Sequence, residues 1–76
     1  MSENYPLAKP DPIIPLTAEK RASMTFEQRV QYALSFIDVI VAESPTHNAA
    51  ALADELSLRT NVGFPDAVKA VMEAGY

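Results

Sequence analysis

The clearest pattern in this chain is a run of apolar residues at helical spacing that begins just after Thr25. Thr25 and Gln28 fit the capping box, in which an N-cap hydroxyl is followed three residues later by Gln. Pro45 disfavours helical geometry at Ser44, so the helix should end before that position. We therefore predict a first helix over about residues 25–43. One face of it carries Phe26, Val30, Ala33, Leu34, Ile37, Ile40 and Val41.

The apolar arc of this first helix is wider than one neighbour can cover. At roughly 100° per residue, Tyr32, Phe36 and Val39 extend the arc well past the first face. A surface helix needs an apolar stripe only somewhat wider than ~100°, and this arc covers about twice that. The helix should therefore contact two neighbours. The second neighbour is an N-terminal arm, a symmetry mate or another protein.

A second helix is predicted over about residues 46–59. Thr46 or Ser44 is its expected N-cap, because hydroxyl side chains accept hydrogen bonds from the free N–H groups of a first turn. Pro45 suits an early helical position. The small residues on the inner face would let this helix approach the first one closely. That inner face is formed by Ala49, Leu52, Ala53 and Leu56.

A third helix is predicted over about residues 65–74. Gly63 is the expected residue of positive φ that ends the second helix, and Pro65 suits the first position of the next one. Asp66 complements the helix dipole, and Gly75 stops the helix at its other end. No strand pattern of useful length occurs, so residues 25–76 should form an all-α domain of three helices. The apolar side of the third helix carries Phe64, Ala67, Val68, Val71 and Met72.

Residues 1–24 differ from this helical domain and are predicted to form an extended, partly disordered arm. They hold four of the six prolines, and proline favours extended over helical backbone. Thr17 is expected to cap a single helical turn through Ala22. Two interpretations remain open, a disordered tail or an arm that lies in a groove of this molecule or of a partner. The second depends on the apolar residues Tyr5, Leu7, Ile13, Ile14 and Leu16.

Length, charge and composition narrow the class of protein. Seventy-six residues allow one small domain, and the chain carries a net charge of −4 and no cysteine. The lack of cysteine excludes disulfides and thiolate metal sites, which fits a reducing cytosol. The longest uncharged stretch, residues 44–53, is well short of the ~20 residues of a membrane-spanning helix. Since there is no secretory signal or lipidation motif, we expect a cytoplasmic protein without membrane contact.

Few groups in the chain suit catalysis or metal binding. Ser44 and His47 are close enough for a contact, but no third group nearby in sequence would orient the histidine. Asp54 and Glu55 are adjacent, so they diverge by ~100° on a helix and do not share an ion easily. The two glycines are too far apart for a phosphate-binding loop. We therefore predict no enzyme activity and assign no catalytic, metal-binding or cofactor-binding residue.

Two segments resemble helix-turn-helix and winged-helix regulators. Residues 52–58, Leu-Ala-Asp-Glu-Leu-Ser-Leu, resemble the helix that precedes a recognition helix, and residues 72–76 resemble the end of that recognition helix. The resemblance implies a DNA-binding transcriptional regulator. It departs from the pattern at Pro65, which falls inside the expected recognition helix, where Lys69 is the only cation. Because residues 25–76 hold three basic residues against seven acidic ones, their charge disfavours nucleic acid.

Residues 51–71 also resemble the N-terminal segment of elongation factor Ts. That family's motif runs Leu-Arg-x-x-Thr-Gly-x-Gly-apolar, followed by an acid and Lys-Lys-Ala-Leu. Ser57, Asn61 and Val68 depart from the motif, and residues 60–67 are also similar to a hairpin in the C-terminal domain of the ribosomal stalk protein. The resemblance implies a ubiquitin-associated-type three-helix module that contacts elongation factor Tu. The matching residues are Leu56, Thr60, Gly63, Phe64, Asp66, Lys69 and Ala70.

We therefore predict an all-α protein that acts by binding another protein. It would be a small acidic regulator, inhibitor or assembly component, encoded by a bacterium or a phage. A second copy is the simplest partner, because homo-oligomers reuse one apolar patch about a two-fold axis. The helix-turn-helix regulator and the translation-factor-binding module remain as alternatives. The predicted partner-binding residues are Ile13, Ile14, Leu16, Tyr32, Phe36 and Val39.

Overall fold

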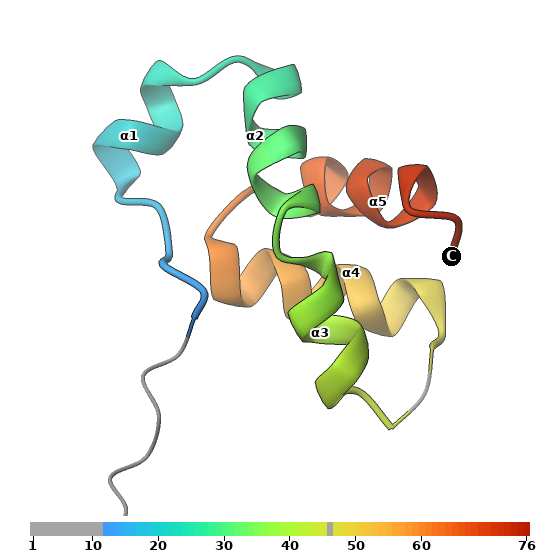
Figure 1. Cartoon of the computed structure of the whole chain (residues 1–76). Coiled ribbons are helices and arrows are strands. Elements are labelled where there is room, and N and C mark those ends of the chain that lie inside the picture. The colour runs from blue at the N-terminus through green and yellow to red at the C-terminus, as the bar shows by residue number, and fades with distance from the viewer. Residues whose placement is uncertain (1–11, 46) are drawn as a thin grey trace, which may run out of the picture.

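The computed structural model describes residues 12–45 and 47–76, which fold as five helices. The helices are α1 (Ala18–Ser23), α2 (Phe26–Leu34), α3 (Ile37–Glu43), α4 (Ala49–Thr60) and α5 (Phe64–Glu73) (Figure 1). No strand occurs in this part of the chain, so the all-helical prediction is confirmed, whereas the prediction of three helices is wrong. Among the same residues, no helix has the length and apolar character to cross a bilayer.

The predicted first helix is split into α2 and α3 at Ser35 and Phe36. Phe36 has φ −110° and ψ 4°, and its N–H donates to Ala33 O at 3.0 Å in a tighter turn than the α-helix. The Ser35 hydroxyl donates to Tyr32 O at 2.6 Å, a local bond that competes with the helical ladder. The break redirects the chain, so that α2 packs against α5 and α3 packs against α4 (Figure 1). One straight helix over residues 25–43 would not follow this path.

Two of the predicted helix starts are present. The Thr25 hydroxyl accepts a hydrogen bond from the Gln28 N–H at 3.1 Å, and the Gln28 side chain accepts one from the Thr25 N–H at 2.9 Å. The Thr17 hydroxyl accepts from the Lys20 N–H at 3.0 Å and caps α1. The predicted extended arm therefore contains a helix over Ala18–Ser23. Its first part, residues 1–11, lies outside the described residues.

The start of α4 differs from the prediction. The Asn48 side chain accepts hydrogen bonds from the N–H groups of Ala50 and Ala51 at 3.0 and 3.2 Å, so Asn48 is the N-cap. Asparagine serves this role as well as the hydroxyl residues do. Ser44 ends α3 instead, and Thr46, the other predicted cap, lies outside the described residues. The helix therefore begins three residues later than the sequence predicts.

The turn between α4 and α5 uses its residues differently from the prediction. Asn61, not Gly63, has the left-handed backbone, with φ 62°, which asparagine tolerates better than most residues. Gly63 has φ −67° and precedes α5 as its N-cap residue. The Gly63 N–H donates to Asp66 Oδ2 at 2.8 Å, and a Cβ added at Gly63 would lie only 3.0 Å from the same oxygen. Glycine is therefore favoured here by a close approach and not by its φ angle.

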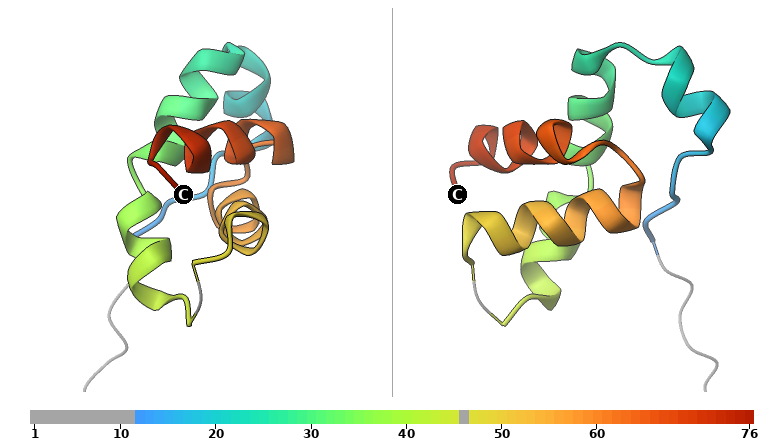
Figure 2. Two further views of the ribbon diagram at one scale, coloured as in Figure 1. Left: turned by 90° about the vertical axis from the view of Figure 1, so that its right-hand side faces the viewer. Right: turned by 180° about the vertical axis from the view of Figure 1, so that it is seen from behind.

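The core lies where α2, α4 and α5 meet. Figure 2 shows α4 end-on in its left view, with α5 crossing above it, and the two helices pack against each other. Three buried alanines, Ala53, Ala67 and Ala70, let the helices approach closely. The other buried apolar residues are Ile13, Leu16, Val30, Ala33, Ile37, Ile40, Leu52, Leu56, Val62 and Val71.

The core also includes a non-helical segment, residues 13–17, which we call the N-terminal strap. The Leu16 N–H donates to Thr60 O at 2.9 Å, and the Asn61 side chain donates to Leu16 O at 2.7 Å. The Tyr32 hydroxyl donates to Ile14 O. The strap is therefore attached to α2 and to the end of α4, whereas α1, which follows it, buries no residue and stands apart from the other helices in the right view of Figure 2.

Candidate interaction surface

The predicted partner-binding residues do not form one exposed surface. Ile13 and Leu16 are only 3% and 7% exposed, because the strap places both side chains in the core of this chain. Ile14, which lies between them, is 68% exposed. An extended backbone directs successive side chains to opposite sides, which explains why Ile13 and Ile14 differ so strongly. Two of the three predicted arm residues are thus used inside the molecule.

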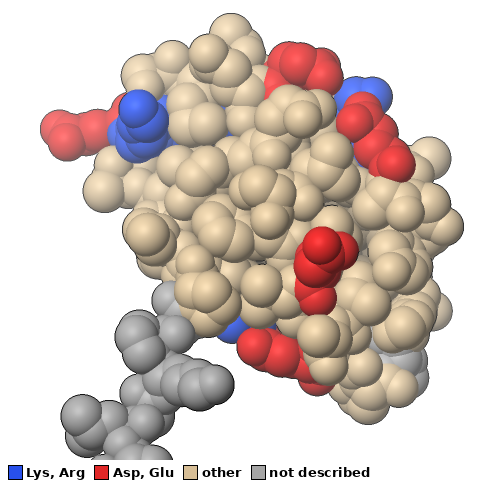
Figure 3. All heavy atoms as spheres, viewed as in Figure 1, with Lys and Arg blue, Asp and Glu red and all other residues tan. Residues whose placement is uncertain are grey.

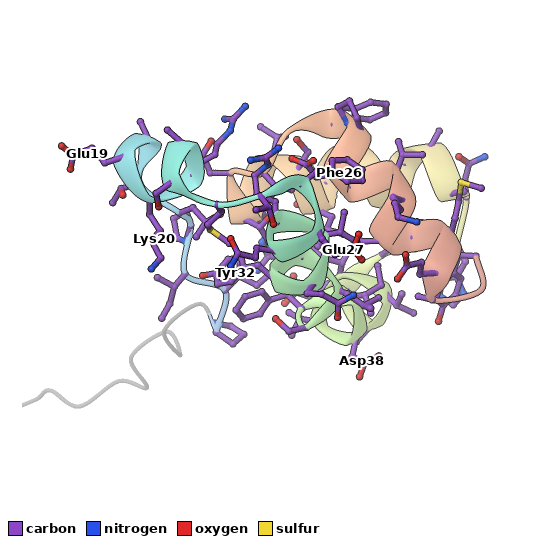
Figure 4. All side chains as sticks on the ribbon, turned by 90° about the horizontal axis from the view of Figure 1, so that it is seen from above. Glu19, Lys20, Phe26, Glu27, Tyr32 and Asp38 are labelled. Carbon is purple, nitrogen blue, oxygen red and sulfur yellow. The ribbon has the colours of Figure 1, made fainter. Side chains whose placement is uncertain are left out.

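The other three residues, Tyr32, Phe36 and Val39, are half-buried and pack against the core. The rings of Tyr32 and Phe36 meet edge to face with their centroids 5.2 Å apart. The Tyr32 hydroxyl is bonded to Ile14 O of the strap, and Figure 4 shows the Tyr32 side chain on the strap side of α2. The wide apolar arc of the predicted helix is therefore covered in part by the strap and in part by the bend between α2 and α3.

An exposed apolar surface beside a groove lies on α5. We call it the α5 outer face and define it by Phe64, Pro65, Val68, Lys69, Met72 and Glu73. Phe64 is 49% and Met72 is 66% exposed, so about half of the Phe64 surface and most of the Met72 surface stay in water. An open groove of about 590 Å³ is lined by Pro65, Val68, Lys69, Met72 and Glu73. The sequence predicts one apolar side of this helix, but Phe64 and Met72 lie on the opposite side from the core.

One edge of the α5 outer face is charged. Lys69 Nζ lies 2.9 Å from Glu73 Oε2, one helical turn away, and the two side chains are substantially exposed. Glu73 raises the pKa of Lys69 through this hydrogen bond and its negative charge, and the charge of Glu27 on α2 acts in the same direction. Figure 4 shows Glu27 and Phe26 on the side of α2 next to α5. The groove therefore has an apolar floor and a rim with both signs of charge.

Another large apolar side chain is exposed on α4. Leu58 is 71% exposed, but its helical neighbours Asp54 and Glu55 are polar and exposed. A second groove of about 400 Å³ lies between α3 and α4 and has a mixed polar and apolar lining that includes Glu43 and Arg59. Figure 3 shows lysine and arginine groups separated from one another, each beside an acidic group. That face of the molecule has no continuous basic patch of the kind that binds a phosphate backbone.

The buried polar pair of the fold connects α2 to α5. Arg29 Nε donates to Asp66 Oδ2 at 2.9 Å, and Asp66 is only 4% exposed. The Arg29 side chain also donates to Met24 O at 2.6 Å. Sequence reasoning placed Asp66 at a helix start but missed its partner, because the two residues are 37 positions apart. The pair holds α5 in place beside α2, so its role is structural.

The sequence assigned no catalytic role to Ser44 or His47 and no metal site. The His47 ring packs edge to face against the Tyr76 ring, with centroids 5.7 Å apart. Within residues 12–45 and 47–76, no group of three or more His, Cys, Asp or Glu side chains is placed to hold a metal ion. These observations leave the α5 outer face as the candidate site.

Comparisons with protein-family models, with curated proteins and with solved structures found no match. The resemblance of residues 51–71 to elongation factor Ts, and that of residues 52–58 to helix-turn-helix regulators, therefore remain predictions. The function has to be argued from the surface of this chain.

Proposed function

We propose that this protein is a protein–protein interaction module that binds its partner through the α5 outer face. The observation that carries the proposal is the exposure of Phe64 and Met72 on a helix whose other side already packs into the core. The folded chain buries only about half of the Phe64 side chain and less of Met72, because the rest of their surface stays in water. Contiguous exposed apolar surface beside a groove is typical of a protein-binding site.

The size of the face indicates a weak complex. Fully burying a side chain such as Phe, Val or Met stabilises an association by about 1.5–3 kcal/mol. Association itself costs roughly 4–15 kcal/mol in lost freedom of motion. Three apolar side chains, Phe64, Val68 and Met72, therefore support a reversible contact of modest affinity. That suits a small regulator, inhibitor or assembly component, as the sequence predicts.

Site-specific crosslinking in the organism that encodes the chain tests this proposal. A photo-crosslinking amino acid in place of Met72 should give a protein adduct, because this position lies in the groove. The same amino acid in place of Leu58 is the control, since Leu58 is equally exposed but lies outside the groove. Adding Val68→Glu should abolish the adduct at position 72. Equal adducts at both positions, or none at position 72, would contradict the proposal.

One feature of the structure favours the helix-turn-helix alternative. Residues 61–63, which include Gly63, join α4 to α5 in a three-residue turn, a length typical of such motifs. Against it, Lys69 is the one cation of α5 and is paired with Glu73. Retention on DNA that weakens steeply with salt would favour this alternative. The translation-factor alternative predicts instead that the adduct at position 72 contains elongation factor Tu.

A further inference from the structure

Two pairs of residues on the α5 outer face are spaced almost symmetrically about one point. Val68 and Met72 are both apolar, and they lie at equal distances on either side of position 70. Lys69 and Glu73, which carry opposite charges, are centred one residue further along. When the helix is reversed, each member of a pair therefore takes nearly the place of a chemically compatible side chain.

The two kinds of pair occupy separate stripes of the helix. Val68 and Met72 are four residues apart and lie one above the other, and so do Lys69 and Glu73. A two-fold axis perpendicular to α5 makes the second copy's helix run in the opposite direction. The same axis keeps the apolar stripe (Val68 and Met72) facing the second copy's apolar stripe, and the charged stripe (Lys69 and Glu73) facing its charged stripe. In an antiparallel pair of α5 helices, Val68 therefore meets the second copy's Met72 and Lys69 meets its Glu73. In a parallel pair the two-fold axis runs along the helices and moves the charged stripe to the opposite side, so Lys69 and Glu73 would not face the second copy's charged residues.

We infer that the occupant of the α5 outer face is a second copy of this chain, packed with its α5 antiparallel about a two-fold axis. This inference rests on the proposed function and names its partner. A stable dimer interface covers about 800 Å² per partner, and one short helix face offers less than that. The dimer is therefore weak and forms reversibly as the protein concentration rises. Glu27 on α2 adds negative charge to the rim beside Lys69 of the same chain.

Charge reversal in the full chain tests the geometry, with self-association measured by sedimentation equilibrium. Lys69→Glu gives two acidic residues on the rim, and Glu73→Lys gives two basic ones, so each variant should self-associate about five- to tenfold more weakly than the natural chain. Mixing the two variants should restore association, because each Glu then meets a Lys. The double variant K69E/E73K should also self-associate like the natural chain. Far-UV circular dichroism checks that helix content is kept.

Disulfide trapping provides a second readout that does not depend on charge, because the chain contains no cysteine of its own. A mixture of Val68→Cys and Met72→Cys chains should form mixed disulfides faster than either variant forms disulfides with itself. The reason is that the antiparallel pair places position 68 opposite position 72.

The antiparallel dimer is overturned if the natural chain stays monomeric at high concentration. It is also overturned if the mixed variants associate no better than each alone, or if Met72→Cys pairs with itself as fast as with Val68→Cys. If one of these results occurs but the adduct at position 72 contains another protein, only the dimer is contradicted and the proposed function stands. An absent adduct at position 72 would remove both.

Discussion

The inner and outer faces of α5 have similar residues and opposite surroundings. Val71 is 1% exposed and packs into the core, while the next residue, Met72, is 66% exposed on the groove. Ala67 and Ala70 are also fully buried, whereas Phe64 is half exposed. A helix of ten residues thus carries an apolar surface on both sides, although the fold uses only one of them.

This difference shows that apolar character alone does not assign a residue to the core. Side-chain volume distinguishes the inner face, because small side chains such as Ala67 and Ala70 let α5 approach α4 closely. The outer face carries larger side chains that have nothing to fill in this chain. Four pairs of substitutions, each comparing a residue packed within the fold with a more exposed one, test how much the two kinds of position contribute to stability.

The largest effect is expected from introducing a carboxylate on the two faces of α5. Val71→Asp places an unpaired charge in the core, which costs several kcal/mol and is a large share of the roughly 5–15 kcal/mol that stabilises a folded domain. We expect the midpoint of thermal unfolding to fall by more than ~15 °C, measured by circular dichroism. Met72→Asp should leave this midpoint nearly unchanged. A similar loss in both variants would mean that Met72 also belongs to the core.

The next effect concerns the strap, where buried Leu16 is compared with exposed Ile14. Leu16→Ala should lower the free energy of unfolding by about 2–5 kcal/mol, because it leaves a cavity where the strap meets the core. Ile14→Ala should change it by less than about 0.5 kcal/mol. Urea unfolding of the two variants measures the difference. A small effect for Leu16→Ala would show that the strap is dispensable for folding.

The two ion pairs of α5 provide a third comparison. Asp66→Asn leaves the partly buried Arg29 without its charged partner and should cost about 1–3 kcal/mol of unfolding free energy. Glu73→Gln removes the exposed partner of Lys69 and should cost less than about 0.5 kcal/mol. Both values come from the same urea experiment. Adding salt should reduce the smaller effect further, because exposed pairs are screened.

The smallest effect is expected from removing single hydroxyl groups. Tyr32→Phe loses the hydrogen bond to Ile14 O but keeps the ring contact with Phe36, so it should cost about 0.5–1.5 kcal/mol. Tyr76→Phe, at the exposed end of the chain, should leave the free energy of unfolding unchanged within error. Equal values for the two tyrosines would indicate that the Tyr32 bond does not hold the strap.

Much of the local structure could be predicted because it depends on neighbours in sequence. The capping box at Thr25 and Gln28, the Thr17 cap and the positive φ of Gly75, 94°, all follow from short-range hydrogen bonds and sterics. The predicted third helix over residues 65–74 differs from α5 by one residue at each end. The candidate site was partly visible too, since Phe64 and Met72 were recognised as apolar but assigned to the side that faces the core. Val68, which was assigned to the same side, does pack against the core.

The sequence by itself determined that this chain is helical and where several of its helices begin and end, since capping and periodicity act within a few residues. Only the tertiary structure decided that α2 and α3 part at Phe36, that Asn61 takes the left-handed turn to reach Leu16 O, and that Ile13 is buried while Met72 is not. The physical reason is that burial depends on which elements meet in space. An apolar pattern shows which helix faces would gain from burial, but the neighbouring elements in the fold decide which of those faces is buried.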